Sequence, residues 1–581
     1  MSLVTLKINN KEITVEQGTT ILDAARQLNI KIPTLCYLNL HDNKTTNNPG
    51  SCRICVVEVE GRKNLAPSCC TSVAPNMVVS TNTPRVIAAR KTIIELLLSD
   101  HPNDCLTCQK NLNCELQALA SNYGITNLRY NGAKSVAMKE TKNPSIVRDT
   151  SKCILCRRCD AVCSQVQKVG AIGPVNRGFD TTISTPFFED LDKSVCTLCG
   201  QCVSVCPTGA LMEKDNTFDV LTAIGDKDKY VIVQTAPAVR AALGEEFGIN
   251  DKAVTGKMVS SLRQLGFDKV YDTDFAADLT IIEEATEFLS RYKSGENLPM
   301  ITSCCPGWVS FIEKHYGNLL NLPSTCKSPQ QMWGAIAKSY LANKLGIPVE
   351  KLVVVSVMPC VAKKSEASRE EFTVENGIQD IDIVITTREL AKMIKIAGLD
   401  FSELEESAFD TIMGESTGAG VIFGTTGGVM EAALRTAYEW ITNSTLENLD
   451  FKVARGLDAV KEASIVIDGN TVNIAIVSGL SNAKQLLDNI DETTKKYHFI
   501  EVMACPGGCI NGGGQPYSND KYSLIEKRMN ALYTEDKNKV IRKSHENPEI
   551  IKLYEEFLGK PNGEKSHNLL HTHYTNKQCS K

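Results

Sequence analysis

Most of the 23 cysteines in this 581-residue chain are spaced as ligands of iron–sulfur clusters. Thiolate ligation needs a reducing compartment, whereas secreted disulfide scaffolds are short chains. The N-terminus begins directly as an alternating strand, without the basic and apolar regions of a signal peptide. The sequence therefore predicts a cytoplasmic metalloprotein rather than a disulfide-bonded one.

The tightest spacing is an internal repeat between residues 153 and 207. Two runs of the form Cys-x2-Cys-x2-Cys-x3-Cys follow one another, and both are similar to the run of bacterial two-cluster ferredoxins. In that arrangement the fourth cysteine of each run ligates the other cluster, which keeps the two clusters close enough for electron transfer. The repeat predicts one 4Fe–4S cluster on Cys153, Cys156, Cys159 and Cys206, and a second on Cys196, Cys199, Cys202 and Cys163.

Residues 1–80 predict a small domain of another type. Residues 3–8 and 13–15 alternate as a hairpin, and Thr20 then caps a helix with one apolar face. The cysteines that follow resemble those of plant-type 2Fe–2S ferredoxins, although the first gap is longer here. Zinc is the alternative metal, and Cys70 could replace its neighbour. The expected ligands are Cys36, Cys52, Cys55 and Cys69.

A third type of site combines histidine with cysteine. The segment reads His101-x3-Cys105-x2-Cys108-x5-Cys114. One imidazole and three thiolates can hold the four irons of a 4Fe–4S cluster, and a neutral ligand changes its charge and potential. A lone histidine is usually structural, but one placed four residues before a Cys-x2-Cys pair favours ligation.

After about residue 225 the pattern changes to short β-branched runs, at 230–234, 352–357, 381–385 and 473–477, separated by helical patterns. This rhythm predicts parallel sheets covered by helices. Cys305, Cys360 and Cys505 each lie at or just past the carboxyl end of such a run, where open parallel sheets bind their ligands. Together with Cys509, they are expected to converge on a further cluster between two α/β lobes.

Three blocks of sequence carry a family resemblance. Residues 302–308 read TSCCPGW, residues 358–364 read MPCVAKK, and residues 501–516 read EVMACPGGCINGGGQP. They look like the three signatures of FeFe-hydrogenases, in the family order, and the resemblance to the long clostridial type extends over essentially the whole chain. It implies an H-cluster, in which a 4Fe–4S cubane is joined through a cysteine sulfur to a diiron unit with CO, cyanide and azadithiolate ligands. By this resemblance the cubane ligands are Cys305, Cys360, Cys505 and Cys509, with Cys509 as the bridge.

The same resemblance implies a route for protons. Cys304 would be the free thiol that exchanges protons with the bridging amine, and the onward residues would be Glu284, Ser324, Glu287 and Arg291. The sequence supports part of this route, because Glu284 and Glu287 are three residues apart in a helical pattern and share a face. Without the resemblance, both would be interpreted as solvated helix glutamates.

Further residues of the pocket follow from the resemblance. Lys363 looks like the lysine that hydrogen-bonds a cyanide, whereas Lys364 is expected at the surface. Met358 and Met503 match methionines that pack around the diiron unit and exclude water.

One position departs from the family pattern. Pro237-Ala238 stands where many hydrogenases have proline and then serine, whose hydroxyl bonds a cyanide. Ala238 lacks that donor, so we expect altered poise or stability of the diiron unit rather than lost activity.

The expected fold class is multidomain α+β and α/β, because the chain is too long for a single core. Cys326 and Cys579 have no evident partner, and the polar tail is expected to be disordered. The predicted domains are a β-grasp 2Fe–2S domain (1–80), a His/Cys3 cluster domain (81–125), a two-cluster ferredoxin domain (126–220), a hydrogenase catalytic domain of two lobes (221–570) and a tail (571–581).

The expected function is reversible reduction of protons to H₂, with reduced ferredoxin as electron partner and with maturation factors that assemble the H-cluster. The chain has no Gly-x-Gly-x-x-Gly dinucleotide fingerprint, so use of NAD(P)H would require flavin-containing partner subunits. Residues 234–240 (QTAPAVR) are similar to catalytic subunits of multi-subunit, NAD(P)-linked or electron-bifurcating hydrogenases as well as to stand-alone enzymes.

Two functions of other classes remain open, namely an iron–sulfur assembly factor without a diiron unit and an H₂ sensor. The intact Cys304-Cys305 pair and the full set of accessory clusters oppose the first, and the lack of a recognisable signalling module opposes the second. A net charge of -5 gives no argument for nucleic-acid binding, and no apolar stretch is long enough to span a membrane.

Overall fold

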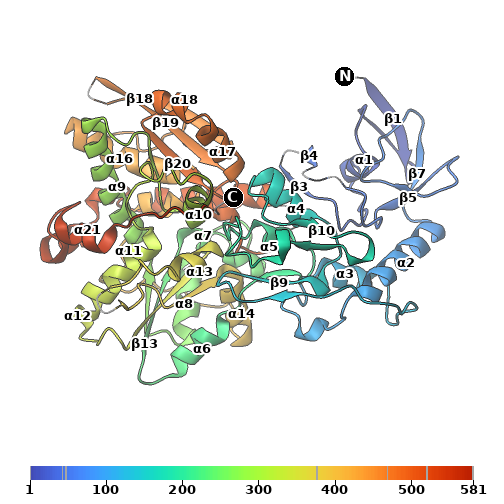
Figure 1. The fold of residues 1–581 in the computed structure, drawn as a ribbon, viewed down its shortest axis with the longest axis horizontal. Coiled ribbons are helices and arrows are strands. Elements are labelled where there is room, and N and C mark those ends of the chain that lie inside the picture. Colours follow the sequence, from blue (N-terminus) through green and yellow to red (C-terminus); the bar gives the residue numbers. More distant parts are fainter. Residues whose placement is uncertain are drawn as a thin grey trace.

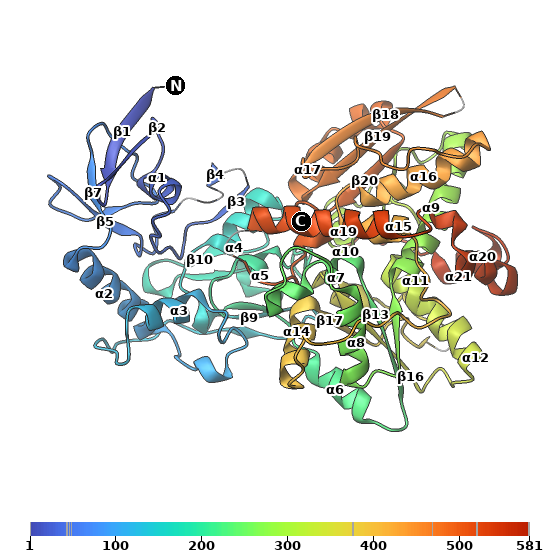
Figure 2. The ribbon, with the colours of Figure 1, turned by 180° about the vertical axis from the view of Figure 1, so that it is seen from behind.

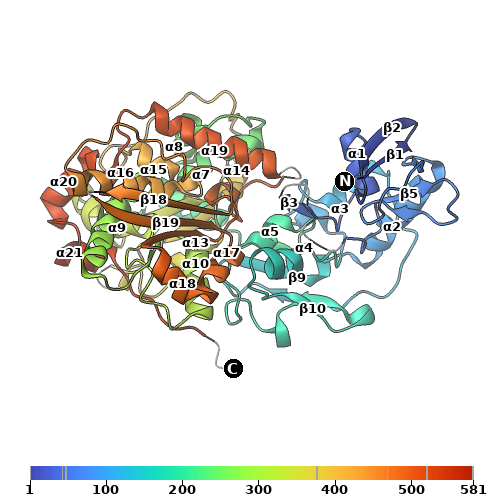
Figure 3. The ribbon, with the colours of Figure 1, turned by 90° about the horizontal axis from the view of Figure 1, so that it is seen from above.

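The computed structural model describes residues 2–41, 44–45, 47, 49–374, 377–467, 469–518 and 521–578. The molecule is elongated, with the N-terminal elements at one end and the α/β elements at the other (Figure 1; Figure 3). The segment that carries the tight cysteine repeat lies between these two ends (Figure 3). The loop after Cys36 also reaches the repeat, because Leu38 packs with Val162 and Val205.

The N-terminal sheet confirms the predicted hairpin and helix. Val4, Leu6 and Ile8 are buried on one face of β1, as its alternation requires. The Thr20 hydroxyl accepts a hydrogen bond from the Asp23 backbone N–H at 3.1 Å and begins the helix. The sheet order is β2-β1-β7-β5-β6. The bounds are β1 (Leu3–Ile8), β2 (Lys11–Glu16), α1 (Ile21–Gln27), β5 (Val56–Val59), β6 (Ala66–Pro67) and β7 (Val78–Ser80).

Short helices and strands position the next cysteines. One helix ends at the residue before His101, and another begins after Cys114. Farther along, a small antiparallel sheet of order β12-β9-β8 supports the two cysteine runs. These elements are α2 (Pro84–Asp100), α3 (Glu115–Asn122), β8 (Lys139–Glu140), β9 (Ile146–Asp149), α4 (Arg158–Ala161), β10 (Gly173–Val175), β11 (Thr182–Ser184), α5 (Gln201–Val205) and β12 (Leu211–Glu213).

Two four-stranded sheets form the centre of the α/β part. The first has the order β14-β13-β16-β17 and is parallel throughout, as predicted. Every residue of β16 is buried, which is typical of a strand covered by helices on both faces. The second sheet has the order β15-β20-β19-β18 and is mixed, because its edge strand β18 pairs antiparallel with β19. The bounds are β13 (Tyr230–Thr235), β14 (Lys269–Asp272), β15 (Met300–Ile301), β16 (Leu352–Met358), β17 (Ile383–Thr386), β18 (Val460–Ile467), β19 (Asn470–Ser478) and β20 (Phe499–Met503).

The 21-residue helix α9 (Asp274–Ser294) packs against both lobes. Twelve consecutive residues of this helix, Asp274 to Ala285, are buried, and so is Glu287. Its glutamates Glu283, Glu284 and Glu287 therefore face protein and not solvent. Helix α19 crosses the face seen from behind (Figure 2). The other helices are α6 (Thr217–Gly225), α7 (Pro237–Arg240), α8 (Thr255–Leu265), α10 (Pro306–His315), α11 (Pro329–Ile336), α12 (Ala342–Leu345), α13 (Ala362–Ala367), α14 (Thr387–Ile396), α15 (Gly418–Val421), α16 (Gly428–Thr442), α17 (Leu480–Asp488), α18 (Ile490–Lys496), α19 (Lys521–Asn538), α20 (Pro548–Leu553) and α21 (Glu564–Leu570).

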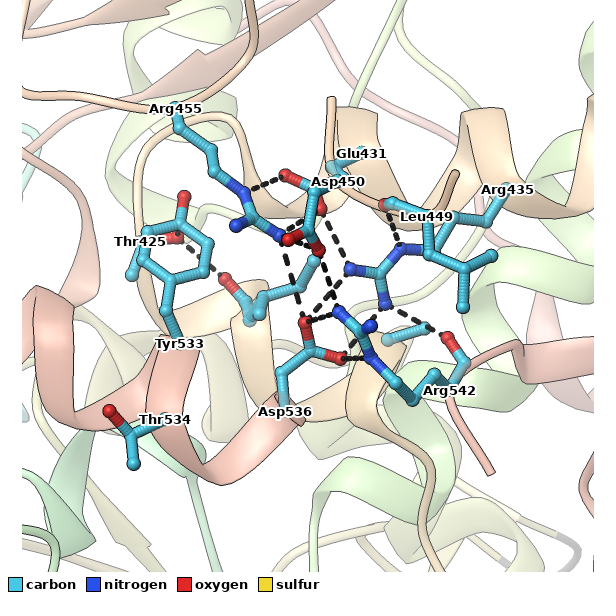
Figure 4. Close-up of polar contacts among 12 residues, drawn as sticks. Thr425, Glu431, Arg435, Leu449, Asp450, Arg455, Tyr533, Thr534, Asp536 and Arg542 are labelled. Carbon is cyan, nitrogen blue, oxygen red and sulfur yellow. Dashed lines mark hydrogen bonds and ion pairs between the residues drawn. The ribbon is translucent and has the colours of Figure 1, made fainter. Parts of the chain in front are cut away.

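A buried group of ions joins α16 to α19. Asp536 accepts from Arg435 and Arg542 at distances between 2.6 and 3.0 Å, and Arg435 also pairs with Glu431 at 2.7 Å (Figure 4). Arg455 donates to Glu431 and to Asp450. Each acid is thus neutralised by guanidinium groups, which offsets the cost of burying the charges.

The C-terminal segment is ordered over its described length, contrary to the prediction of a disordered tail. His571 is buried and forms an antiparallel bridge with Cys326. Farther on, the Tyr574 hydroxyl donates to the Ser324 carbonyl at 2.5 Å, and Lys577 pairs with Glu313 at 3.1 Å. The polar composition misled the prediction because these side chains find partners in the protein. Cys579 lies outside the described residues.

Among the helices of the described ranges, none combines the length and the apolar character needed to cross a bilayer.

Candidate functional site

An apolar cavity of about 80 Å³ lies between the two α/β lobes. It collects most of the predicted catalytic residues from segments that are far apart in the chain. Cys304 and the four predicted cubane ligands all line it, together with Pro237, Ala238, Met358, Lys363 and Met503. The four cysteines that were predicted to converge therefore line one cavity.

Strand ends position these cysteines. Cys305 follows β15 and caps α10, Cys360 lies two residues past β16, and Cys505 lies two residues past β20. Because parallel strands end at the same edge of their sheet, the three thiols meet where the lobes face each other. Cys509 reaches the same cavity through a turn at Gly508, which has a φ of 98° and whose hypothetical Cβ would lie 2.6 Å from the Thr426 nitrogen.

The chemistry of these donors fits an iron cluster. Burial raises the pKa of Cys509 to about 12 and also raises the pKa values of Cys305, Cys360 and Cys505. Such thiols remain neutral in an apolar cavity unless a metal ion replaces the proton. The cavity also contains an unsatisfied acceptor, because Gln330 Oε1 has no hydrogen-bond partner among the described residues.

Lys363 supplies the cation of the cavity. Its Nζ donates to Glu366 Oε2 at 2.8 Å and to the Cys304 carbonyl at 3.2 Å. Burial alone would lower the pKa of Lys363, but the Glu366 carboxylate outweighs burial and raises that pKa. The ammonium group therefore stays charged beside the place where the resemblance implies anionic ligands.

Lys364 was expected at the surface, and that expectation is wrong. The side chain is buried, and its Nζ donates to the Val384 carbonyl at 2.7 Å and to Glu389 at 3.0 Å. Lys364 thereby connects α13 to the first sheet. The sequence shows only two adjacent lysines, which does not indicate that one of them is buried.

A row of polar groups leads from the cavity to the edge of the protein. Glu284 is near enough to Cys304 for its charge to raise the pKa of that thiol, after burial. Ser324 Oγ donates to Glu287 Oε2 at 2.8 Å, and Arg291 donates to Glu287 Oε1 at 2.6 Å. The structure thus joins Ser324, Glu287 and Arg291 by hydrogen bonds and places Glu284 within electrostatic reach of Cys304 and Glu287, while their role as a proton route stays a prediction.

Glu284 is the most perturbed carboxyl group of this row. Neither of its buried oxygens has a hydrogen-bond partner of ordinary geometry within the described ranges, although Ser324 and the Ser303 backbone lie close enough to lower its pKa slightly. Burial, followed by the charge of Glu287, raises the pKa of Glu284 to about 8. The group therefore holds a proton at neutral pH and can release it at little cost.

The C-terminal segment fixes the loop that carries Ser324, which the sequence analysis missed. The Lys327 N–H donates to the Leu570 carbonyl and the Thr572 N–H donates to the Thr325 carbonyl, both at 2.7 Å. The Tyr574 hydroxyl holds the Ser324 carbonyl itself. No feature of the sequence indicated this contact, because the polar tail from residue 571 onward was expected to be disordered.

The remaining walls of the cavity are apolar. Met358 and Met503 are both buried, and the Cys509 thiol contacts Met503 Sδ at 4.0 Å. Ala238 is fully buried beside Gly424, where an added Cβ would lie 3.3 Å from the Ala238 Cβ. Thr273, Phe423 and Gln330 also line the cavity, and no motif pointed to them.

In the N-terminal domain the four predicted 2Fe–2S ligands lie in two close pairs. Cys55 and Cys69 have sulfurs 3.2 Å apart, and Cys36 hydrogen-bonds Cys52. This pairing lowers the pKa of Cys36 to about 5 and that of Cys55 to about 6. Cys70 is exposed, and its Sγ lies 3.8 Å from the Pro67 carbonyl instead. This geometry favours Cys69 over Cys70 as the ligand.

His101 is a predicted ligand whose surroundings are compatible with a metal bond. It is buried at the end of α2, and its Nε2 has no hydrogen-bond partner in the part of the chain that the structure describes. The thiols of Cys105, Cys108 and Cys114 follow on the next loop and at the start of α3. An orphaned imidazole nitrogen is costly in a buried position and fits a metal bond.

The eight cysteines of the repeat form two small cavities. One cavity is lined by Cys153, Cys156, Cys159 and Cys206, and the other by Cys163, Cys196, Cys199 and Cys202. This is the crossed grouping predicted from the repeat. Ligation by these residues stays a prediction.

The second of these cavities adjoins the large one. Gln201, between Cys199 and Cys202, donates its amide N–H to Cys505 Sγ at 3.1 Å and to the Asn511 carbonyl at 3.0 Å. A Cβ on Gly513 would lie 2.8 Å from the Gly200 backbone, so only glycine permits this approach. The last accessory site is thus packed directly against the catalytic cavity.

Five family models match consecutive parts of the chain. They are the 2Fe-2S iron-sulfur cluster binding domain (residues 2–84), the NADH-ubiquinone oxidoreductase-G iron-sulfur binding region (90–129), the 4Fe-4S dicluster domain (152–210), the iron only hydrogenase large subunit, C-terminal domain (229–513), and the iron hydrogenase small subunit (520–577). The last match covers α19 and the C-terminal segment.

Two relatives match over almost their whole length. The NADP-reducing hydrogenase subunit HndD of Solidesulfovibrio fructosivorans is 56% identical over 100% of both chains. The chain belongs to the iron-only (FeFe) hydrogenase family. Iron hydrogenase 1 of Clostridium pasteurianum is 42% identical over 98% of this hydrogenase and 99% of the relative. The solved structure of apo FeFe-hydrogenase HydA1 from Chlamydomonas reinhardtii is 43% identical, with a TM-score of 0.57, over 63% of this hydrogenase and 100% of that chain.

Proposed function

We propose that this FeFe-hydrogenase catalyses the reaction 2H⁺ + 2e⁻ ⇌ H₂ in the cavity between its α/β lobes, as the catalytic subunit of an NADP-linked complex. The observation that carries the catalytic part is the convergence of Cys305, Cys360, Cys505 and Cys509 in one cavity beside the unassigned thiol of Cys304. The four cysteines would hold the cubane of an H-cluster, which supplies the redox-active iron and the base at which protons and electrons combine.

Side chains of this chain would carry the protons to and from the cluster. Burial raises the pKa of Cys304 well above its ordinary value, so the thiol holds its proton until a stronger base lies next to it. Glu284 can supply the next proton because its pKa is about 8. Ser324 and Glu287 continue the route, and Arg291 holds Glu287 in place by donating to one of its oxygens at 2.6 Å.

The apolar walls of the cavity keep water away from the cluster site. Met358, Met503 and Phe423 line it with apolar surface, which excludes water from the reacting centre. Lys363 is the cation on this wall and would donate a charge-assisted hydrogen bond to an anionic ligand of the cluster. Ala238, where other family members have serine, offers no hydroxyl for this purpose.

The electron side would use one 2Fe–2S and three accessory 4Fe–4S clusters in the N-terminal third of the chain. Gln201 supports the final transfer, because its amide bonds a predicted cubane ligand while its neighbours are predicted ligands of the last accessory cluster. A hydrogen bond to a ligand sulfur stabilises the reduced cluster and raises its potential.

The electron partner is proposed from the relative that is an NADP-reducing hydrogenase subunit, at 56% identity. This chain has no dinucleotide fingerprint of its own, so NADP(H) would react on a flavin-containing partner subunit. Ferredoxin, the partner expected from the sequence, is the second candidate, because the full-length clostridial iron hydrogenase is 42% identical.

Two measurements test this proposal. Infrared spectra of protein matured with the diiron unit should show intrinsic CO and cyanide bands, together with H₂ evolution from reduced viologen. Protein without these bands after full maturation would contradict the catalytic proposal. Copurification of a flavin-containing subunit and NADP⁺ reduction by H₂ only in its presence would support the complex, whereas an isolated chain that reacts directly with ferredoxin would favour the second candidate.

A further inference from the structure

A buried thiol, imidazole and carboxylate meet beside the proposed proton route. One ligand atom each from Glu287, Cys326 and His571 lies within 4.8 Å of the other two, and all three residues are buried. Cys326 Sγ lies 3.9 Å from Glu287 Oε2. His571 comes from the C-terminal segment, and its backbone bridge to Cys326 fixes the two side by side.

We propose that Glu287, Cys326 and His571 form a binding site for zinc, and that zinc bound there blocks the proton route. Sulfur, nitrogen and oxygen donors from Cys, His and Glu are the set that Zn²⁺ takes in proteins, with water as the fourth ligand. A thiolate and a carboxylate together balance the two positive charges of the ion, so the buried site would be neutral when filled.

The surroundings of the imidazole favour a metal bond. Glu283 Oε2 lies 3.2 Å from His571 Nε2, and the Thr325 hydroxyl lies 2.7 Å from Nδ1. In the tautomer that carries the ring proton on Nε2, toward Glu283, the lone pair of Nδ1 accepts from the Thr325 hydroxyl and becomes available to a metal ion when that hydroxyl turns away. A carboxylate behind the ring is the usual outer support of a zinc-bound histidine.

Two other groups of potential metal ligands differ from this one because basic side chains already neutralise their carboxylates. The Glu431, Asp450 and Asp536 carboxylates are neutralised by three arginines (Figure 4). In the group of Glu439, His545 and Glu546, Lys543 pairs with both glutamates. At the proposed site only Glu287 has a cationic partner among the described residues, and Arg291 takes its Oε1 at 2.6 Å, which leaves Oε2 facing Cys326.

Zinc on Glu287 would interrupt the route at one hydrogen bond. Oε2 now accepts from Ser324 Oγ at 2.8 Å and from the Thr325 N–H at 3.0 Å. A metal ion on this oxygen removes the acceptor of the Ser324 hydroxyl, so protons could no longer pass between Ser324 and Glu287. This effect rests on the proposed function, whereas the binding itself does not.

The experiment uses the mature holoenzyme with chelator removed and measures H₂ evolution as zinc is added, with magnesium as the control ion. We expect inhibition that saturates at about one zinc per chain, is reversed by a chelator, and leaves the iron content unchanged. Zinc-edge X-ray absorption should show one sulfur at about 2.3 Å and nitrogen or oxygen neighbours at about 2.0 Å. Each variant is compared with its own zinc-free activity.

Two variants identify the site. Cys326→Ala should raise the half-inhibiting zinc concentration at least about tenfold and remove the sulfur neighbour, and His571→Gln should also weaken inhibition about tenfold. His573→Gln, an exposed histidine two residues away, is the matched control and should behave like the unmodified enzyme.

The outcomes separate the two parts of the proposal. Inhibition that Cys326→Ala and His571→Gln both leave unchanged, or a sulfur neighbour that persists without Cys326, would overturn the site. Zinc bound through Cys326 with full H₂ evolution would overturn the block of the proton route. The proposed function itself fails only if the zinc-free enzyme evolves no H₂.

Discussion

The accessory cluster sites and the catalytic cavity use the same ligand, cysteine, but assemble it in opposite ways. Each predicted 4Fe–4S site of the repeat takes three of its four cysteines from one short run and the fourth from the other run. The catalytic cavity takes Cys305, Cys360 and Cys505 from the ends of three different strands. Local spacing therefore gathers most of each predicted electron-transfer site, whereas the cysteines of the cavity meet only after two lobes have packed together.

Burial acts on the cysteines of the repeat and of the cavity in the same direction. It raises the pKa of Cys153 and of Cys199 to about 11, and it raises the pKa values of the four predicted ligands in the cavity. What sets the cavity apart is one further thiol, Cys304, which lines it beside the four predicted ligands.

The largest effect is expected at Cys304, the thiol of the cavity that is not a predicted cluster ligand. Cys304→Ala removes the proton donor nearest the cluster but none of its ligands, so H₂ evolution should fall about 1000-fold. Iron content and the CO and cyanide infrared bands should be retained, and they serve as the control. Loss of the bands together with the activity would show that Cys304 holds the cluster instead.

Glu284→Gln should lower H₂ evolution by about 100-fold, because an amide cannot release a proton to Cys304. In the unmodified enzyme the pKa of Glu284 is raised to about 8, so the group is protonated below that pH and loses its proton above it. H₂ evolution should therefore decline above about pH 8, while H₂ uptake, which needs the carboxylate as acceptor, should increase. The exposed Glu296→Gln is the matched control, and a variant of Glu284 with an unaltered rate and pH profile would exclude it from the route.

Substitution of a predicted ligand in the N-terminal domain should change the cluster content more than the rate. Cys69→Ala should lose the 2Fe–2S cluster, or about two irons per chain, while the viologen-driven rate falls less than about tenfold. Cys70→Ala is the matched variant, since it removes the adjacent, exposed thiol and should keep the cluster. Iron analysis and the electron paramagnetic resonance of the reduced protein check both, and the reverse result would make Cys70 the ligand.

The smallest effect is expected at Ala238. Ala238→Ser adds a hydroxyl that points toward the cavity and would give a cyanide ligand a hydrogen bond worth about 1 kcal/mol. The rate should change by less than about fivefold, but the cyanide stretching bands should shift. Unchanged band positions in the infrared spectrum would mean that the hydroxyl does not reach the cluster.

The sequence by itself determined the cluster types and their order, because cysteine spacing within one loop is a local property. The hairpin with its Thr20 cap was predictable for the same reason. The crossed grouping of Cys163 and Cys206 was predictable because the sequence contains the whole repeat twice, as two-cluster ferredoxins do. The parallel first sheet also followed from its β-branched runs.

Only the tertiary structure decided which distant side chains meet. It buried Lys364 against Glu389, joined Gln201 to Cys505, and packed His571 and Tyr574 onto the loop of Ser324 and Cys326. Each of these contacts joins segments that are far apart in the sequence, and no periodicity or motif predicts that they meet. A polar side chain finds such a partner only when two lobes have already excluded the water between them, and that condition belongs to the fold rather than to any local pattern.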